Sequence, residues 1–190
     1  MTPSSQCLRD HFLISMPHLN DQNFSQTVTY ICDHSEYGAM GIVVNRPVGI
    51  TLSELCDHLN LHCPSIANQQ QEIFSGGPVR NDRGYVLHKA TDPVEWASSH
   101  CIADNIYLST SMDAIEAAAE GRFNHDYLIA LGCAGWGPGQ LEQELSDNVW
   151  LSCPANSDIL FSIPVGERLQ AAASTLGINL DLLTAHSGHA

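Results

Sequence analysis

Hydrophobic and polar positions alternate along this chain in short blocks separated by Gly, Pro, Asn and Asp, a pattern typical of strands joined by turns. Ten blocks are rich in β-branched, aromatic or other apolar residues, and each predicts a strand. The predicted strands cover residues 12–15, 27–32, 40–45, 72–75, 84–88, 106–109, 127–131, 149–152, 158–161 and 178–183. We expect the second and third to form one hairpin, and the fourth and fifth to form another around a long polar turn.

Apolar residues three and four positions apart predict helices. This spacing places Leu52, Leu55 and Leu59 on one face of a helix, and Thr51 or Ser53 can cap its start. Two further helices are predicted from a capping residue or proline at the start and a glycine at the end. The three predicted helices cover residues 52–60, 112–121 and 165–176.

We expect the rest of the chain to be arranged around residues 127–150, which read YLIALGCAGWGPGQLEQELSDNVW. Its apolar first five residues predict a buried strand, and the closely spaced glycines after them predict a tight turn. Pro138 suits the first turn of a helix whose apolar face is Leu141 and Leu145. The acidic residues of this helix are expected to face water, and they are Glu142, Glu144 and Asp147. Such a turn presents backbone N–H groups to a ligand, or simply packs a helix against a sheet.

Strands and helices follow one another here without regular alternation, which favours an α+β fold over a doubly wound α/β sheet. We predict a single compact domain over residues 1–190, with a mixed, mostly antiparallel sheet and flanking helices. The length and the 44% hydrophobic content suffice for one core. Residues 1–9 and 184–190 are expected to be flexible ends.

The charge of the chain restricts its partners. Lys and Arg number 7 against 21 Asp and Glu, which gives a formal net charge of −14 at pH 7. Nucleic-acid binding depends on basic side chains that displace phosphate counterions, so this composition argues against a nucleic-acid partner. A protein partner or a small anionic ligand is the expected alternative, and no cofactor is indicated.

Neither a membrane span nor a secretory leader is predicted. No apolar run approaches roughly 18 residues, and the start of the chain lacks a basic segment followed by an apolar one. Seven cysteines without a CxxC pair fit reduced, mostly buried thiols better than a disulfide framework. We therefore expect a cytoplasmic protein.

Three ordered blocks resemble a known family. They are FLISMPHLNDQNFSQTVTYICDHSEYGAMGIVVNRPVG, IFSGGPVRNDRGYVLH and GCAGWGPGQLEQEL, and together they resemble the YqgE/AlgH family of bacterial proteins. The resemblance implies an α+β fold, a compact mixed sheet with flanking helices. It implies no agreed biochemical activity and no catalytic residue; members are described as transcriptional regulators, and one branch is named for an effect on alginate synthesis. Cys133 departs from the family pattern, which has a larger aromatic residue there.

The scarce basic residues suggest a site. Three of the seven, at positions 46, 80 and 83, lie in turns of these blocks, and a guanidinium group binds carboxylate or phosphate through paired hydrogen bonds. We expect the turns to converge near residues 135–139 and to bind an anionic ligand or a partner. The candidate residues are Arg46, Arg80, Arg83, Gly77, Gly135, Trp136 and Gly137. In the alternative interpretation, each arginine pairs with a nearby acid such as Asp82 and pins its own turn.

Other candidate groups have a structural explanation beside the functional one. Trp136 is predicted to pack in the core, and becomes an interface anchor only if it is exposed. Cys133 has the position of a reactive thiol at a helix start, or of ordinary packing. Ser75, His88 and Asp82 are the residue types of a catalytic triad, but their spacing matches no hydrolase signature.

Cys56, His58, His62 and Cys63 are candidate metal ligands. On a helix, His58 and His62 would lie four positions apart on one face, a spacing used for zinc. No second ligand pair is indicated elsewhere in the sequence. Solvated histidines at a helix end are therefore the preferred interpretation, and no metal is predicted.

These observations favour a binding or regulatory module over an enzyme, acting through a protein or small-ligand contact around the glycine segment. The alternative is an enzyme acting on a small anionic substrate, with the three arginines as clamps and Cys133 or Ser75 nearby. A regulator that contacts DNA directly ranks third, because the charge of the chain opposes it.

Overall fold

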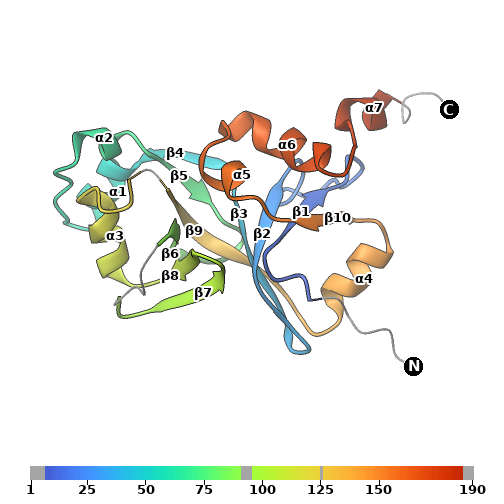
Figure 1. The fold of residues 1–190 in the computed structure, drawn as a ribbon, viewed down its shortest axis with the longest axis horizontal. Helices are drawn as coiled ribbons and strands as arrows, with labels where there is room; N and C mark the ends of the chain where they lie inside the picture. The colour runs from blue at the N-terminus through green and yellow to red at the C-terminus, as the bar shows by residue number, and fades with distance from the viewer. Residues whose placement is uncertain (1–6, 91–95, 125, 186–190) are drawn as a thin grey trace.

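The computed structural model describes residues 7–90, 96–124 and 126–185. In this part of the chain ten strands form one sheet, with α1, α2 and α3 gathered at one end and α4, α6 and α7 at the other (Figure 1). The strands are β1 (His11–Ser15), β2 (Val28–Ser35), β3 (Gly38–Val43), β4 (Pro47–Thr51), β5 (Glu72–Ser75), β6 (Val79–Lys89), β7 (Ser99–Ala103), β8 (Ile106–Ser109), β9 (Tyr127–Trp136) and β10 (Trp150–Pro154). The helices are α1 (Leu52–His58), α2 (Ile66–Gln69), α3 (Met112–Ala119), α4 (Gln140–Ser146), α5 (Ser157–Phe161), η1 (Val165–Glu167), α6 (Arg168–Ser174) and α7 (Leu180–Ala185).

The sheet is organised around β9. The strand order is β10-β1-β2-β3-β9-β6-β8-β7, and β4 and β5 form a branch beside β9. β9 pairs with β3, β5 and β6. Its pairing with β5 is parallel, and the other described ladders are antiparallel. This confirms the α+β fold with a mixed, mostly antiparallel sheet that the sequence predicts.

β9 is longer than the sequence analysis predicts. The prediction ends the strand at residue 131, but the strand continues through the first glycines to Trp136. Gly132 has a φ of 76°, a backbone conformation that strains other residues, and it lies where β9 exchanges β5 for β3 as its neighbour. Helix α4 begins at Gln140 rather than at Pro138. The predicted tight turn is therefore limited to residues 137–139, and the earlier glycines bend a continuous strand.

The predicted hairpin of residues 72–75 with residues 84–88 is wrong. β5 and β6 pair with opposite edges of β9, at the same residues 129–131. The connection between them crosses β9 at Gly77, where a Cβ would lie 2.3 Å from the carbonyl carbon of Cys133. Backbone touches backbone at this crossing, so the chain passes over the sheet instead of turning back along it.

Two further predicted strands are helices. Residues 158–161 belong to α5, and residues 178–183 overlap α7. Asn156 caps α5, because its side-chain oxygen accepts a hydrogen bond from the N–H of Asp158 at 2.7 Å. Both segments are only four to six residues long, and such short apolar patterns fit a helical turn as well as a strand.

Other local predictions are confirmed. Thr51 and Glu54 form a reciprocal capping box at the start of α1: the N–H of Thr51 donates to Glu54 Oε2 at 2.8 Å, and the N–H of Glu54 donates to Thr51 Oγ1 at 3.3 Å. Helix α3 lies within the predicted segment, and α6 follows η1 within residues 165–176. Helix α1 ends at His58, two residues before the predicted end.

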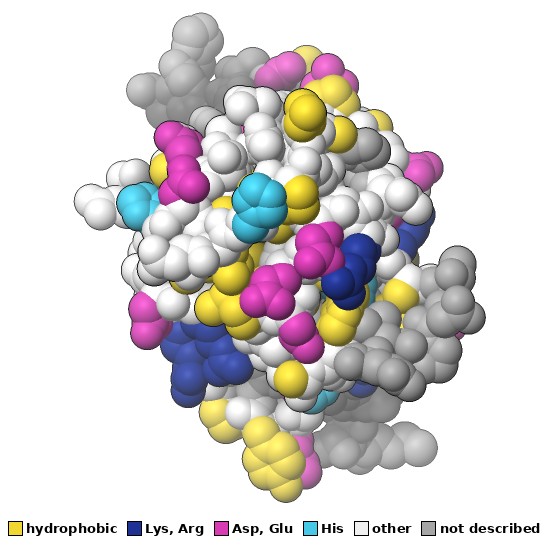
Figure 2. Space-filling view, turned by 90° about the vertical axis from the view of Figure 1, so that its left-hand side faces the viewer, with side chains coloured by type: hydrophobic (Ala, Val, Ile, Leu, Met, Phe, Trp, Pro, Cys, Tyr) yellow, Lys and Arg dark blue, Asp and Glu magenta, His cyan; other side chains and the backbone are white. Residues whose placement is uncertain are grey.

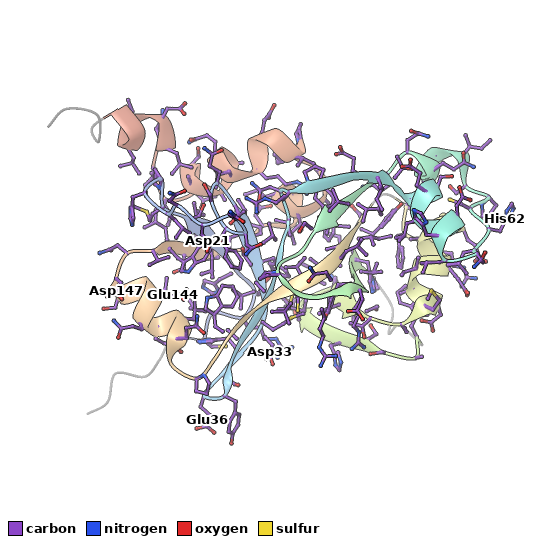
Figure 3. All side chains as sticks on the ribbon, turned by 180° about the vertical axis from the view of Figure 1, so that it is seen from behind. Asp21, Asp33, Glu36, His62, Glu144 and Asp147 are labelled. Carbon is purple, nitrogen blue, oxygen red and sulfur yellow. The ribbon has the colours of Figure 1, made fainter. Side chains whose placement is uncertain are left out.

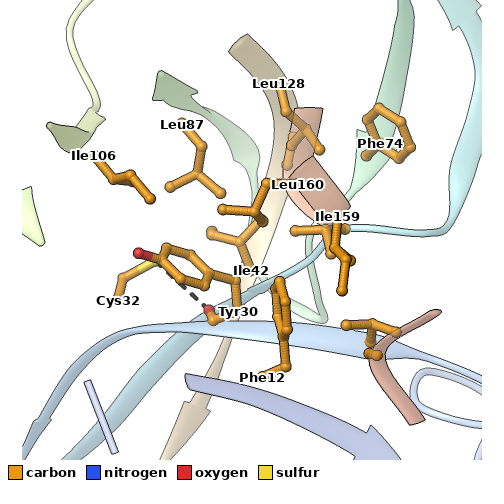
Figure 4. Packing of buried hydrophobic residues seen from close by; sticks show 14 of the residues in the cluster. Phe12, Tyr30, Cys32, Ile42, Phe74, Leu87, Ile106, Leu128, Ile159 and Leu160 are labelled. Atoms are coloured by element: carbon orange, nitrogen blue, oxygen red, sulfur yellow. Dashed lines mark hydrogen bonds between the residues drawn. The ribbon is translucent and has the colours of Figure 1, made fainter. Parts of the chain in front are cut away.

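Both faces of β9 are buried. On one face Leu128 joins a cluster that includes Phe12 and Tyr30, whose rings pack edge to face with centroids 5.9 Å apart, and Leu160 of α5 (Figure 4). On the other face Ile129 packs in a second cluster beneath α1 and α3. Successive residues of a strand point to opposite faces, so burial on both sides explains the uninterrupted apolar run in the sequence.

Arg168 is a buried basic residue that ties α6 to the sheet. Its guanidinium donates to the carbonyl oxygens of Val44 at 2.6 Å and Ile163 at 3.1 Å, and it lies 5.3 Å from the ring centre of Phe74. Burial lowers the pKa of Arg168 to about 10. Two carbonyls and a ring face replace the water that this cation loses, so Arg168 has a structural role.

Candidate functional site

A cavity of about 500 Å³ lies where the β2–β3 hairpin, β6 and the β7–β8 hairpin meet. Its lining combines basic, hydroxyl and thiol groups with one carboxylate, among them Arg9, Arg83, His100, Tyr85, Cys32 and Asp33. Two guanidinium groups at one cavity are unusual in a chain with a net charge of −14. We therefore take this cavity, the arginine cavity, as the candidate site.

The basic residues of the chain differ in whether they form an ion pair with a carboxylate. Figure 2 views the molecule from the end that carries α1, α2 and α3, where the few basic groups are outnumbered by acidic side chains. Arg122 forms an ion pair with Glu120. Within residues 7–90, 96–124 and 126–185, no ion pair with a carboxylate involves Arg9, Arg80 or Arg83. The pairing with Asp82 considered from the sequence is therefore not formed.

Arg9 enters the cavity from the turn before β1. Its Nε donates to the carbonyl oxygen of Ile102 at 2.9 Å, and its Nη2 donates to that of Cys101. The neighbouring Leu8 is buried, and its N–H donates to Nδ1 of His34 at 2.9 Å. Residues 7–9 are thus held in place, whereas the sequence analysis expects them to be loose; residues 1–6 and 186–190 lie outside the described residues.

Arg83 reaches the cavity from β6. Its Nη2 donates to Oγ1 of Thr110 at 3.1 Å, and the same hydroxyl lies 2.8 Å from Oγ of Ser98. Both arginines are therefore oriented by neutral oxygen atoms. A guanidinium group carries five N–H donors, so each retains donors for a further partner.

Tyr85 and Cys32 line the cavity, and Cys133 contacts Tyr85. The thiol of Cys133 donates to the hydroxyl of Tyr85 at 3.5 Å. Burial raises the pKa of Tyr85 to about 12, and the neighbouring Cys133 adds to this rise, while the charges of Arg83 and Arg80 act in the opposite direction. Burial also raises the pKa of the Cys32 thiol well above its usual range. The hydroxyl and the Cys32 thiol are therefore neutral at pH 7 and offer hydrogen bonds rather than a nucleophile.

The structure brings only part of the predicted site to this cavity. Arg83 lines it, and Arg80 is near enough for its charge to act on Tyr85. Arg46 does not line this cavity; its guanidinium instead donates to three carbonyl oxygens of the β1–β2 loop. Arg9 is not among the predicted site residues; the only local sign in the sequence that this segment is held is the apolar Leu8 beside it, which the structure buries.

The glycine segment lies at a different cavity. Trp136 is 7% exposed, so its predicted core position is confirmed, and with Gly135 it lines a space that also contains Asp21 and Glu144. The N–H of Gly137 donates to Oε1 of Gln140 at 3.0 Å and is not free for a ligand. Glu144 is half-buried and accepts hydrogen bonds from two indoles, whereas the sequence predicts that it faces water. These carboxylates repel anions, so we confine the anion hypothesis to the arginine cavity.

The fold places the two cysteines and the two histidines among the candidate metal ligands in different environments. Cys56 is buried and Cys63 half-buried against α3, whereas His58 and His62 are exposed. Figure 3 shows His62 at the outer edge of the molecule. Because α1 ends at His58, the two histidines do not share a helical face. In the part of the chain that the structure describes, no group of three or more His, Cys, Asp or Glu side chains is arranged to hold a metal ion.

Among the described residues, His88 is the most deeply buried imidazole. Its Nε2 lies 2.9 Å from Oγ of Ser109, which in turn donates to Oγ of Ser99 at 3.0 Å. Its hydrogen-bonding partner is thus not Ser75, and the triad considered from the sequence is not assembled. The ring of Trp96 packs against it, with centroids 4.7 Å apart. Burial lowers the pKa of His88 to about 4, so the imidazole is neutral at pH 7.

Comparison with known proteins identifies the family. The model of the AlgH-like family matches residues 12–181. The chain belongs to the AlgH-like family. AlgH of Pseudomonas aeruginosa is 50% identical to this AlgH-like chain over 184 residues, which are 96% of each protein. A relative from Chromohalobacter salexigens is 46% identical over 184 residues, 97% of this chain and 99% of the relative.

Two solved structures share the fold. The solution structure of AlgH from Pseudomonas aeruginosa matches with a TM-score of 0.78 at 49% identity, covering 100% of both chains. A crystal structure of a Corynebacterium diphtheriae protein matches with a TM-score of 0.73 at 19% identity, covering 93% of this chain and 91% of that one, and supports the fold alone. No helix among the described residues is long and apolar enough to cross a membrane.

Proposed function

We propose that this AlgH-like chain is a non-enzymatic binding module that takes a small carboxylate- or phosphate-bearing ligand in the arginine cavity. The observation that carries the proposal is the pair Arg9 and Arg83, which face one cavity without a carboxylate ion-pair partner among the described residues. Arginine forks recognise planar and tetrahedral anions through paired hydrogen bonds, and charge-assisted bonds of this kind are the strong ones.

The rest of the lining supports selective binding. Ser98, Thr110 and Tyr85 supply hydroxyl groups for neutral parts of a ligand. Asp33 is the only carboxylate of the described lining, and it favours a ligand with a hydroxyl or amine at that side over one that is anionic throughout. The alternative function, an enzyme for a small anionic substrate, requires a nucleophile and a base within hydrogen-bond reach. Cys133 instead donates its thiol to Tyr85, and no described hydrogen bond joins it to a histidine.

A regulatory role fits ligand binding better than direct DNA contact. Arg9, Arg83 and Thr110 come from three separate parts of the chain, so a ligand that bridges them would restrain the start of the chain, β6 and the end of β8 together. The net charge of −14 opposes a nucleic-acid surface. A cytoplasmic location is part of the proposal, and seven free thiols support it, because such thiols persist in reducing compartments.

The test is a titration of ¹⁵N-labelled protein with three probes, inorganic phosphate, pyrophosphate and succinate, followed by NMR. We expect at least one probe to shift the amide signals around residues 83–85 and 100–102. Replacing both Arg9→Gln and Arg83→Gln should weaken that binding at least about tenfold, because two charge-assisted contacts are lost.

Arg122→Gln is the matched control, since it removes one positive charge from an arginine that is ion-paired outside the cavity. It should leave the affinity unchanged. If all three probes fail to bind at millimolar concentration, or if the control loses as much affinity as the double variant, the proposal is wrong.

A further inference from the structure

A second cavity, of about 380 Å³, lies between the β1–β2 loop, the end of β9, α4 and the start of β10. Its described lining shares no residue with the arginine cavity. The groups that matter for recognition are three aromatic rings, two carboxylates and apolar edges, and they include Phe24, Trp136, Trp150, Asp21, Glu144 and Leu19. This set, the aromatic cavity, has the opposite electrostatic character to the arginine cavity.

The three rings form one connected surface. Phe24 packs edge to face on Trp150, with ring centroids 5.5 Å apart, and lies 6.2 Å from the ring centre of Trp136. The two tryptophan rings are 6.1 Å apart, at 78° to each other. Such mutual packing fixes the rings in place, so they present a rigid wall without a loss of side-chain freedom on binding. The negative face of an indole ring attracts cations more strongly than that of any other side chain.

Glu144 is oriented by the same tryptophans. Its Oε2 accepts hydrogen bonds from Nε1 of Trp136 at 2.9 Å and Nε1 of Trp150 at 2.8 Å, and its Oε1 accepts one from Gln140 at 2.9 Å. These donors are neutral, and no Lys, Arg or His lies in the described lining. The carboxylate is therefore held at the cavity with its negative charge uncompensated by a basic side chain.

Asp21 supplies a second carboxylate. Its Oδ1 accepts hydrogen bonds from the backbone N–H groups of Asn23 and Phe24, at 2.8 and 3.1 Å, which orients the group on the β1–β2 loop. Figure 3 shows Asp21 and Glu144 on the same side of the molecule, and both line the aromatic cavity. Two oriented carboxylates beside indole rings produce a negative potential at a partly apolar space.

We propose that the aromatic cavity binds a small organic cation with a methylated ammonium group. The rings and carboxylates attract its charge, while Leu19, Val149 and the ring faces accept its methyl groups, which a hydrated inorganic ion lacks. Aromatic cages bind quaternary ammonium ligands such as choline in other proteins. A metal ion fits poorly, because two carboxylates are too few ligands for a hard cation.

Tetramethylammonium chloride is the probe, titrated against sodium chloride at equal ionic strength. We expect it to shift the indole N–H signals of Trp136 and Trp150 in NMR spectra and to change tryptophan fluorescence, with saturation that sodium does not reproduce. Trp96 lies outside the aromatic cavity, so its indole signal should remain in place and serves as an internal reference.

Two conservative substitutions test the carboxylates and the aromatic rings of the site separately. Asp21→Asn removes a charge while keeping an oxygen that can accept the backbone N–H bonds, and Phe24→Leu removes a ring while keeping an apolar side chain. Each should weaken tetramethylammonium binding about fivefold, the size of one partly desolvated cation–π or charge contact. Asp147→Asn is the matched control: it removes one negative charge after α4, is exposed and lies outside the cavity, and should not change the affinity.

The proposal is overturned if sodium shifts the two indole signals as much as tetramethylammonium does. It is also overturned if Asp147→Asn weakens binding as much as Asp21→Asn does, since the effect would then be general charge screening. Unchanged affinity in Phe24→Leu, in a variant whose thermal unfolding matches the parent, would equally contradict a role for the rings. None of these outcomes depends on the arginine cavity, so this proposal can fail while the proposed function holds.

Discussion

Replacing Gly77 with alanine is expected to destabilise the protein by about 3–5 kcal/mol, close to the stability of many whole domains. The added Cβ would lie 2.3 Å from the carbonyl carbon and 2.4 Å from the carbonyl oxygen of Cys133, and both atoms belong to the backbone of β9. No flexible side chain can move aside there. The φ of 146° at Gly77 adds strain of its own.

Urea unfolding followed by circular dichroism measures this loss as a lower midpoint at an unchanged slope. Gly166→Ala is the matched control, because no atom lies within 4 Å of a Cβ there. We expect the control to stay within about 0.5 kcal/mol of the parent. A Gly77→Ala protein as stable as the control would show that β9 and the crossing connection are not in backbone contact.

Acidification is expected to destabilise the protein by roughly 3 kcal/mol through His88 alone. The pKa of this imidazole falls from 6.5 in the unfolded chain to about 4 in the fold, because burial disfavours its charged form. Between these pH values the unfolded state binds a proton that the folded state excludes, so the free energy of unfolding decreases as the pH falls through this window. At about 1.4 kcal/mol per pKa unit, a difference of about 2.5 units accounts for the expected loss.

The measurement compares the parent with His88→Gln, a variant that cannot titrate. Gln retains a group that can hydrogen-bond to Ser109, and it is expected to lower stability at pH 7. The prediction concerns the difference between pH 7 and pH 4, since other groups titrate alike in both proteins. The parent should lose about 3 kcal/mol more than the variant over this range. Equal losses would mean that His88 charges freely in the folded state.

The sequence predicts local structure better than it predicts pairing. The apolar runs of β1, β2, β8 and β9 identify strands, and Thr51 identifies the start of α1, because these features depend on neighbours in the sequence. The partner of β5 depends instead on Gly77 fitting against Cys133 of β9, 56 residues later in the sequence, a contact that no local pattern records. The glycines of β9 were misread for the same reason, since a glycine that bends a strand resembles one that ends it.

At the candidate site, too, the residues with local sequence signals are predicted and those held by distant contacts are not. Arg83 was identified from its turn and from the family resemblance. Arg9 was assigned to a loose end, because its anchors, the carbonyl oxygens of Cys101 and Ile102, lie more than 90 residues away in the sequence. The aromatic cavity can be predicted only in part from the sequence: Trp136 is a candidate residue and Trp150 ends the same segment, but Phe24 and Asp21 reach them only through the fold.

The position of β9 also constrains how the chain can be assembled during synthesis. β1, β2 and β3 form one antiparallel set, and β6, β7 and β8 form another, and the sheet joins the two sets through β9. When only residues 1–126 have been synthesised, both sets of strands are therefore present, but β9, which lies between them in the sheet, is not. The edges of β3 and β6 stay unpaired until β9 emerges, and β10 then completes the outer edge at β1. Closure of this fold therefore waits until residues 127–136 have been synthesised, and until then the nascent chain carries the open edges of β3, β5 and β6.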